Sequence, residues 1–205
     1  MAIWQEFFPS VLPHVLGCSD PMLVQELRRS SQEFLRRTRA WKAWLDPQTT
    51  ADGSVEYDLD IPFGSVVVRV EKANVSGASV EVLSAGAQLG DWAHGGAAAN
   101  GLVSPDRTTF RLGSAQVAGK SLSILVSLMP SECAVGIPDE LYRQYADAIG
   151  HGAKARLMGT PGMPWTNVEM AAMNMGLFER AIHSVTVDAW RGHTNTSPRA
   201  RVSWC

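Results

Sequence analysis

The residue types best suited to catalysis or metal binding are sparse in this chain and lie far apart. No two histidines share one helical face at ligand spacing; they stand at His14, His94, His151, His183 and His193. The cysteines are odd in number and no pair has the spacing of a metal or redox motif; they are Cys18, Cys133 and Cys205. We therefore expect no metal, no cofactor, and free thiols in a reducing cytoplasm.

Other catalytic signatures are also missing. The chain has no Gly-x-Ser-x-Gly and no Gly-x-x-x-x-Gly-Lys-Ser/Thr loop. Gly95-Gly96 lies in a small-residue segment without the helix that a nucleotide site requires. Asp139 and Glu140 begin a predicted helix, where carboxylates stabilise the positive end. The sequence thus predicts that the protein is not an enzyme. An unrecognised active site would need a deep pocket holding several titratable groups with shifted pKa values.

Length and composition narrow the class of protein. The 205 residues are 45% hydrophobic and 19% charged, which fits one domain with an insertion or two small domains. The formal net charge of -2 argues against a general nucleic-acid binder. No apolar run approaches the ~18–20 residues of a membrane span. The first residues, Met1–Glu6, lack the basic start of a secretory signal. We expect no membrane partner.

Helices are expected at both ends of the chain. They open at Ser19–Pro21, at Ile137–Asp139 and at a capping box formed by Thr166 and Glu169. Trp165, at the end of a Gly- and Pro-rich break, is expected to fill the junction between the last two helices. Helical spacing predicts a shared core, whose members are Leu27, Phe34, Tyr145, Met173, Leu177 and Phe178.

Between these ends apolar and polar residues alternate, β-branched residues are frequent and glycines mark turns, a pattern typical of β-strands. The expected strands are Lys42–Leu45, Val55–Leu59, Val66–Ala73, Ala78–Leu83, Thr108–Leu112 and Ser121–Met129, with a hairpin turn at Asn74–Gly77. The predicted fold class is α+β: a small helical bundle from both chain ends with an inserted antiparallel β-sandwich-like module. The expected domains are a helical bundle (residues 1–42 and 130–192), a β domain (43–129) and an extended C-terminal docking tail (193–205).

The tail has the chemistry of a docking segment. It contains two arginines and no acidic residue, and it closes with a tryptophan. Aromatic side chains dominate interface energies, so an exposed Trp204 needs a partner surface. The residues expected to dock are Pro198, Arg199, Arg201, Val202 and Trp204. The competing interpretation is a frayed chain end, as many termini are.

A second candidate surface is basic and lies on the first helix. Asp20–Lys42 holds six basic and three acidic residues, a net charge of +3. Such a patch could contact the DNA backbone without reading its sequence. Its members are Arg28, Arg29, Arg36, Arg37 and Arg39. The alternative is a solvated helix face with ordinary salt bridges, such as Glu33 with Arg36 or Arg37.

Several motifs resemble those of the head–tail adaptor (head completion) proteins of tailed bacteriophages. The matching segments are LPHVLGCSDP (Leu12–Pro21), FLRRTRAW (Phe34–Trp41), IPDEL through YADAI (Ile137–Ile149), PGMPW (Pro161–Trp165) and Phe178-Glu179. These segments lie in both helical ends of the chain, and the resemblance covers about half of the residues. The β middle matches in outline, and its Ala85–Asn100 loop is longer than the family pattern.

This resemblance implies a structural protein of the virion neck. Such proteins form a ring, commonly of twelve copies, under the portal of a DNA-filled capsid, after synthesis in the host cytoplasm. The C-terminal tail reaches into the portal, and the β module faces neighbouring copies or the next neck, tail or nozzle protein. Repeated around a ring, the basic patch would form a collar for non-specific contact with genomic DNA. The implied partners are thus the portal protein, other copies of the chain and the component below.

A different class of function would be ligand binding by the β module on a helical support, for instance of carbohydrate. It requires a concave face of exposed aromatic side chains. The middle of the chain offers Tyr57, Phe63, Trp92 and Phe110, which are spread over different strands and loops. The sequence therefore supports this alternative less well than the adaptor.

Overall fold

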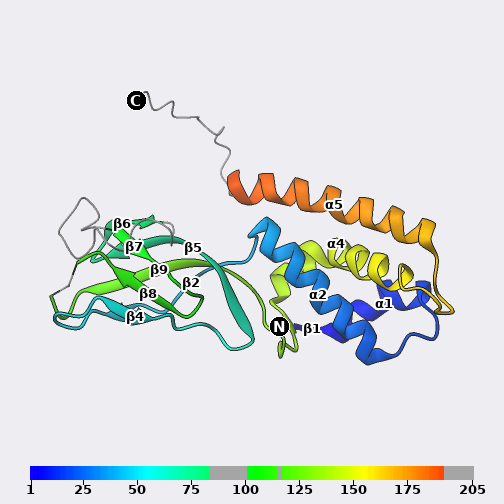
Figure 1. Ribbon diagram of the computed structural model, residues 1–205, viewed down its shortest axis with the longest axis horizontal. Helices are drawn as coiled ribbons and strands as arrows, with labels where there is room; N and C mark the ends of the chain where they lie inside the picture. Colours follow the sequence, from blue (N-terminus) through cyan, green and yellow to red (C-terminus); the bar gives the residue numbers. More distant parts are fainter. Residues whose placement is uncertain (84–100, 115–116, 192–205) are drawn as a thin grey trace, which may run out of the picture. The chain divides into compact units, whose positions relative to one another are not determined.

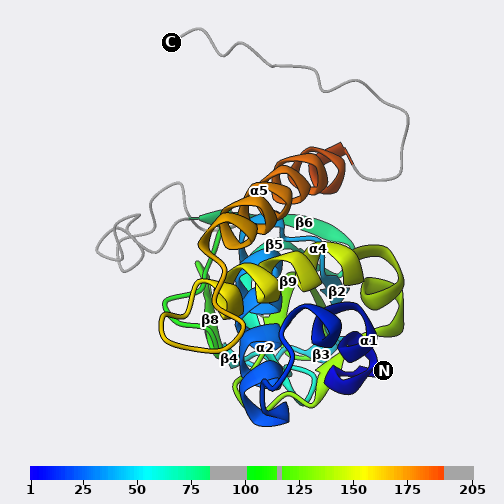
Figure 2. The same cartoon turned by 90° about the vertical axis from the view of Figure 1, so that its right-hand side faces the viewer.

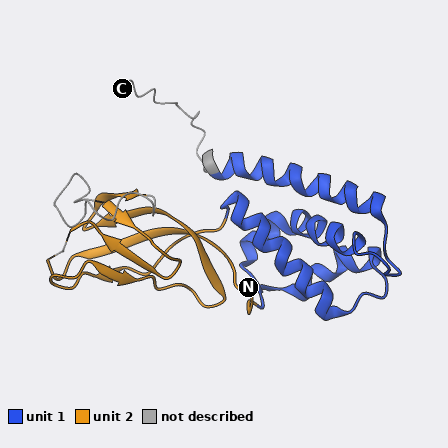
Figure 3. Ribbon diagram, viewed as in Figure 1, with its two compact units in different colours: residues 1–40, 135–205 blue, residues 41–134 orange. Residues whose placement is uncertain are grey.

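A computed structural model describes residues 1–83, 101–114 and 117–191 of the chain (Figure 1). Helices and strands occupy separate segments, and the fold is of the α+β class, as predicted. The chain divides into two compact units (Figure 3): unit 1 comprises residues 1–40 and 135–205, and unit 2 comprises residues 41–134. The sequence had placed the two junctions after residues 42 and 129.

Unit 1 is mainly helical and contains segments from both ends of the chain. Its elements are β1 (Ala2–Ile3), the 3₁₀ turns η1 (Trp4–Phe7) and η2 (Leu12–His14), and the helices α1 (Phe8–Val11) and α2 (Asp20–Thr38), followed by β10 (Gly136–Ile137), α4 (Asp139–Met158) and α5 (Val168–Arg191). Strand β1 pairs antiparallel with β10, with Ala2 opposite Ile137. This pairing ties the N-terminal segment to the chain that leads into α4.

Local chemistry explains where the long helices begin and end. Helix α2 follows an extended Ser19, has Pro21 in its first turn and ends at Thr38, before Arg39, whose φ of 52° is left-handed. Helix α5 is capped by Asn167, whose Oδ1 accepts the Met170 N–H at 3.0 Å. The predicted capping box is therefore wrong by one residue. The Thr166 hydroxyl instead donates to the Thr160 carbonyl at 2.6 Å and closes the preceding turn.

Three aromatic rings from α2, α4 and α5 meet in the core of unit 1. The ring centroid of Phe34 lies 5.2 Å from that of Tyr145 and 6.2 Å from that of Phe178. Phe34, Phe178 and Leu27 are fully buried, whereas Tyr145 is half-buried, which raises the pKa of its hydroxyl. Helix α4 contacts both α2 and α5 (Figure 2). Because each of the three helices contributes one ring to the cluster, the aromatic contacts join all three.

The buried stripe of α5 differs from the predicted one. Leu177 is half-buried and Met173 is exposed, because the side chains that face the core are Ala171, Asn174, Phe178 and Ile182. Trp165 is also half-buried, and its ring lies 3.9 Å from the place where a Cβ on Gly17 would be. It therefore packs against the turn before α2, a contact that lies outside the α4–α5 junction proposed from the sequence.

Unit 2 is a curled sheet. Its strands are β2 (Lys42–Trp44), β3 (Gln48–Thr49), β4 (Glu56–Asp58), β5 (Ser65–Val75), β6 (Ala78–Leu83), β7 (Gly101–Val103), β8 (Thr109–Leu112) and β9 (Ser121–Pro130). The order across the sheet is β2-β9-β5-β6-β7-β8-β4, and β3 also pairs with β9. Its apolar core contains Val67, Phe110, Ile124 and Leu128, among others. The two longest strands, β5 and β9, pair with each other antiparallel.

The β module differs from the expected antiparallel, sandwich-like one in one strand pair. The strands follow one hydrogen-bonded order in a curled sheet, and β6 and β7 run parallel, with Glu81 opposite Gly101 and Leu83 opposite Val103. Parallel neighbours need a crossover connection of about a dozen residues or more. Residues 84–100 are long enough to provide one. The sequence had assigned them to an exposed loop, an assignment that falls outside the described residues.

The predicted hairpin between β5 and β6 is confirmed. Val75 pairs with Ala78, which leaves Ser76 and Gly77 as a two-residue turn. Both residues have positive φ, 48° and 82°, which is the conformation of a type I′ turn. Because the twist of this turn matches that of the strands, it sets the register in which β5 meets β6.

Candidate interaction surfaces

The docking tail lies outside the residues that the structure describes. This applies to Pro198, Arg199, Arg201, Val202 and Trp204, since the description stops at Arg191. The element that leads to the tail is α5, so the surface of α5 is the nearest described surface on which an interface could be built.

The five arginines of the predicted basic patch do not form one exposed surface. Arg29 and Arg36 are exposed, whereas Arg28, Arg37 and Arg39 are half-buried. Arg29 pairs with Glu26 at 2.9 Å on its own helix. At a period of 3.6 residues, Arg29 and Arg36 lie on the same side of α2, while Arg37 is turned away from them. The patch therefore reduces to one pair of exposed guanidinium groups.

Arg37 is held by an ion-pair network that joins three helices. Its two terminal nitrogens donate to the two carboxylate oxygens of Glu179 in α5, both at 2.6 Å, and one of them also reaches Glu33 at 3.3 Å. Glu33 is in turn paired with Arg156 of α4. Of the two salt bridges considered for Glu33, the structure forms the one with Arg37. The hydrogen bonds to Arg37 lower the pKa of Glu179, and those to Glu179 raise the pKa of Arg37.

Acid should weaken this network. A carboxyl with a lowered pKa adds stability that is complete above its ordinary pKa of 4.5 and is lost as the pH falls through the lower folded value. We expect Glu179→Gln to reduce the free energy of unfolding by about 0.5–1 kcal/mol at neutral pH. The difference from the unmodified chain should shrink below about pH 4. Urea titrations at several pH values measure both effects.

Glu26→Gln is the matched control, because it removes an ion pair that lies within α2. It should cost about 0.2–0.5 kcal/mol. A Glu179→Gln penalty that stayed constant down to pH 3 would show that the carboxylate charge is not what stabilises the α2–α5 contact.

Helix α5 carries exposed apolar side chains. Met173 is 51% exposed and Val187 47%, and both lie on the side of the helix opposite the buried Asn174 and Phe178, which pack toward α2 and α4. Exposed apolar side chains on an unpartnered helix face can mark an interaction site. The sequence missed this face because it placed Met173 in the buried stripe. Phe178 is the residue that could have revealed it. If this large ring faces the core, the buried stripe contains Asn174 and Phe178 instead of Met173 and Leu177.

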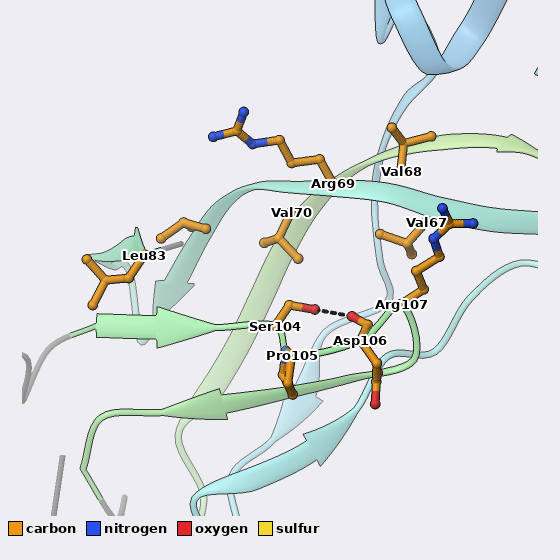
Figure 4. Close-up of a pocket in the computed structure, with 10 residues that line it drawn as sticks. Val67, Val68, Arg69, Val70, Leu83, Ser104, Pro105, Asp106 and Arg107 are labelled. Atoms are coloured by element: carbon orange, nitrogen blue, oxygen red, sulfur yellow. Dashed lines mark hydrogen bonds between the residues drawn. The ribbon is translucent and has the colours of Figure 1, made fainter. Parts of the chain in front are cut away.

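Unit 2 has a cavity of about 510 Å³ beside β5 (Figure 4). Its lining combines Val and Leu side chains with the charged Arg69, Asp106 and Arg107, and none of its lining residues is aromatic. Val67 and Val70 of β5 point toward the Ser104–Asp106 turn (Figure 4). The pKa of Asp106, at its rim, is lowered to about 2. The cause is the hydrogen bonds that its carboxylate accepts from the backbone N–H groups of Thr108 and Thr109, so Asp106 stabilises a turn.

The aromatic residues considered for carbohydrate binding do not form one surface. Tyr57 stacks on the buried Phe110 with centroids 5.5 Å apart. Phe63 is 95% exposed in the turn before β5, and Trp92 lies outside the described residues. None of the three described rings lines the cavity. The geometry therefore does not favour a sugar site.

The described part of the chain has neither a metal-binding cluster nor a membrane-spanning helix. Across residues 1–83, 101–114 and 117–191, no three His, Cys, Asp or Glu side chains lie close enough to bind a metal ion. In the same part of the chain, no helix has the length and apolar character required to cross a bilayer. Comparison of the sequence with protein-family models and with curated proteins gave no match.

Proposed function

We propose that this protein is a structural component of a tailed-bacteriophage virion, a head-to-tail adaptor. It forms a ring, of twelve copies in the form that the resemblance implies, below the portal. It links the DNA-filled head to the tail or the next neck component and docks to the portal through residues 193–205.

One observation carries the proposal: the motifs that resemble adaptors, although scattered along the sequence, contact one another in unit 1. Phe34, Tyr145 and Phe178 come from three of these motifs and meet in one aromatic core. Arg37 and Glu179 belong to two of them and form the bidentate ion pair. Trp165 and Gly17 belong to the other two and lie side by side. Residues that make one shared core are expected to be retained together, which supports a resemblance of the whole helical unit.

Electron microscopy tests the proposal on particles released from cells that produce this protein. Gold-labelled antibodies against the chain should mark the neck between head and tail, and mass spectrometry should detect the chain in purified particles. Absence of the protein from mature particles, or labelling spread over the head, would contradict the proposal.

Removal of residues 193–205 is predicted to separate folding from assembly. The truncated chain should keep its helical circular dichroism and its melting temperature, because residues 1–40 and 135–191 already supply a buried core in unit 1. It should fail to co-sediment with the portal protein. The full-length chain is the control. A truncated chain that unfolds, or that still attaches to the portal, would show that the tail is not the docking element.

A further inference from the structure

A row of exposed residues runs along the outer face of α5 at coiled-coil spacing. Glu169, Met173, Gly176 and Arg180 follow one another at intervals of four, three and four residues, and all four are exposed. This spacing keeps side chains on one side of a helix facing a partner helix. The core side of α5, with Asn174, Phe178 and Ile182, is already occupied inside unit 1.

Gly176 is the unusual member of this row. Glycine in a helix interior is unfavourable, and α5 continues for fifteen residues beyond it to Arg191. Gly152 of α4 has a local explanation, since a Cβ there would lie 2.9 Å from the ring of Phe178. A Cβ at Gly176 would meet no atom within 4 Å. Within the described residues, no contact explains a glycine at this position, and the space above it is open to a group that packs on α5 from outside.

The row is self-complementary when a second copy is reversed against it. Because the intervals are four, three and four, an antiparallel helix repeats the same positions in the opposite order. Glu169 then faces Arg180 of the second copy, and Met173 faces its Gly176. The two-fold axis repeats each contact. The Glu169 carboxylate meets the Arg180 guanidinium at both ends, and each Met173 side chain covers the open space above Gly176 of the other copy.

We propose that two copies of this chain associate in solution through the outer faces of their α5 helices, antiparallel about a two-fold axis. This association does not depend on the proposed function.

The charges determine the direction of pairing. In a parallel pair, Glu169 would face Glu169 and Arg180 would face Arg180, which is repulsive at both ends. In the described residues neither Glu169 nor Arg180 has an ion-pair partner of its own. The one hydrogen bond made by the Arg180 side chain runs from Nε to the Gly176 carbonyl at 3.3 Å. Both groups can therefore pair across an interface.

Sedimentation velocity of the full chain over a range of concentrations is the first test. We expect a monomer–dimer equilibrium. Glu169→Arg and Arg180→Glu should each weaken the dimer at least about tenfold, because like charges then face each other. An equimolar mixture of these two variants should form a heterodimer, since each chain then carries the charges that the other lacks. Arg143→Glu, at an exposed position of α4, is the control and should leave the equilibrium unchanged.

Gly176→Leu separates folding from association. The monomer should gain about 2–4 °C in melting temperature from better helix propensity. The dimer should be lost, because Leu occupies the space into which Met173 of the second copy packs. A chain that stays monomeric up to its solubility limit would overturn the proposal. So would a dimer that survives both charge variants, or a Gly176→Leu monomer that is less stable, which would mean that another part of the chain covers this face.

Discussion

Phe178→Ala should lower the free energy of unfolding of unit 1 by about 3–5 kcal/mol, among the largest losses expected from any single truncation in the helices. The ring is fully buried, lies near Phe34 and fills the space left by Gly152 on α4. Its removal leaves a cavity in the core between α2, α4 and α5, which the surrounding structure closes only in part. Urea denaturation followed by far-ultraviolet circular dichroism measures this loss, since unit 1 supplies the long helices.

Leu177→Ala is the matched control for this prediction. The sequence placed Leu177 in the core, but its side chain is half-buried, so its truncation should cost roughly 1 kcal/mol. A loss at Leu177 as large as that at Phe178 would mean that the buried stripe of α5 lies where the sequence alone had put it.

The second large effect is expected in unit 2. Phe110→Ala should destabilise that unit by about 3–5 kcal/mol, because Phe110 is fully buried and stacks on Tyr57 across the β4–β8 pair. Hydrogen exchange of the β4, β8 and β9 amides should report this loss more directly than circular dichroism. The exchange rates of α4 and α5 should change less, since the two units have separate cores.

Phe63→Ala serves as the control, because it removes the same side chain from a position that is 95% exposed. It should change stability by no more than about 0.5 kcal/mol. Equal losses for the two phenylalanine variants would show that Phe63 is buried in the folded protein, against the structure.

Elements specified by local chemistry could be predicted from the sequence. Helix α2 has a proline in its first turn and an apolar stripe, and the structure begins and ends it at Asp20 and Thr38. Strand β6 was predicted with its observed ends, Ala78 and Leu83, because the Ser76–Gly77 turn marks its start. The shortest strands, such as β3 and β7, were missed. Two or three residues are too few to show a period of two, and these strands exist because a neighbouring strand pairs with them.

The sequence shows which residue types the candidate surfaces contain, but it does not show how those residues are arranged in space. The basic residues of α2 are evident in the sequence, but the partner of Arg37 is Glu179, which lies 142 positions away. The exposed face of α5 is likewise set by contacts between segments that are distant in the sequence. Whether Met173 or Asn174 faces the core depends on where the ring of Phe178 fits between α2 and α4.

The sequence alone therefore determined the α+β class, the helical ends, the long strands and the absence of a familiar catalytic motif. Each of these follows from interactions between residues that are close along the chain. Tertiary structure decided the parallel β6–β7 pair, the pairing of Arg37 with Glu179 and the side of α5 that remains exposed. Those features depend on contacts between distant segments, whose free energies are set by packing and burial, and no local pattern records them.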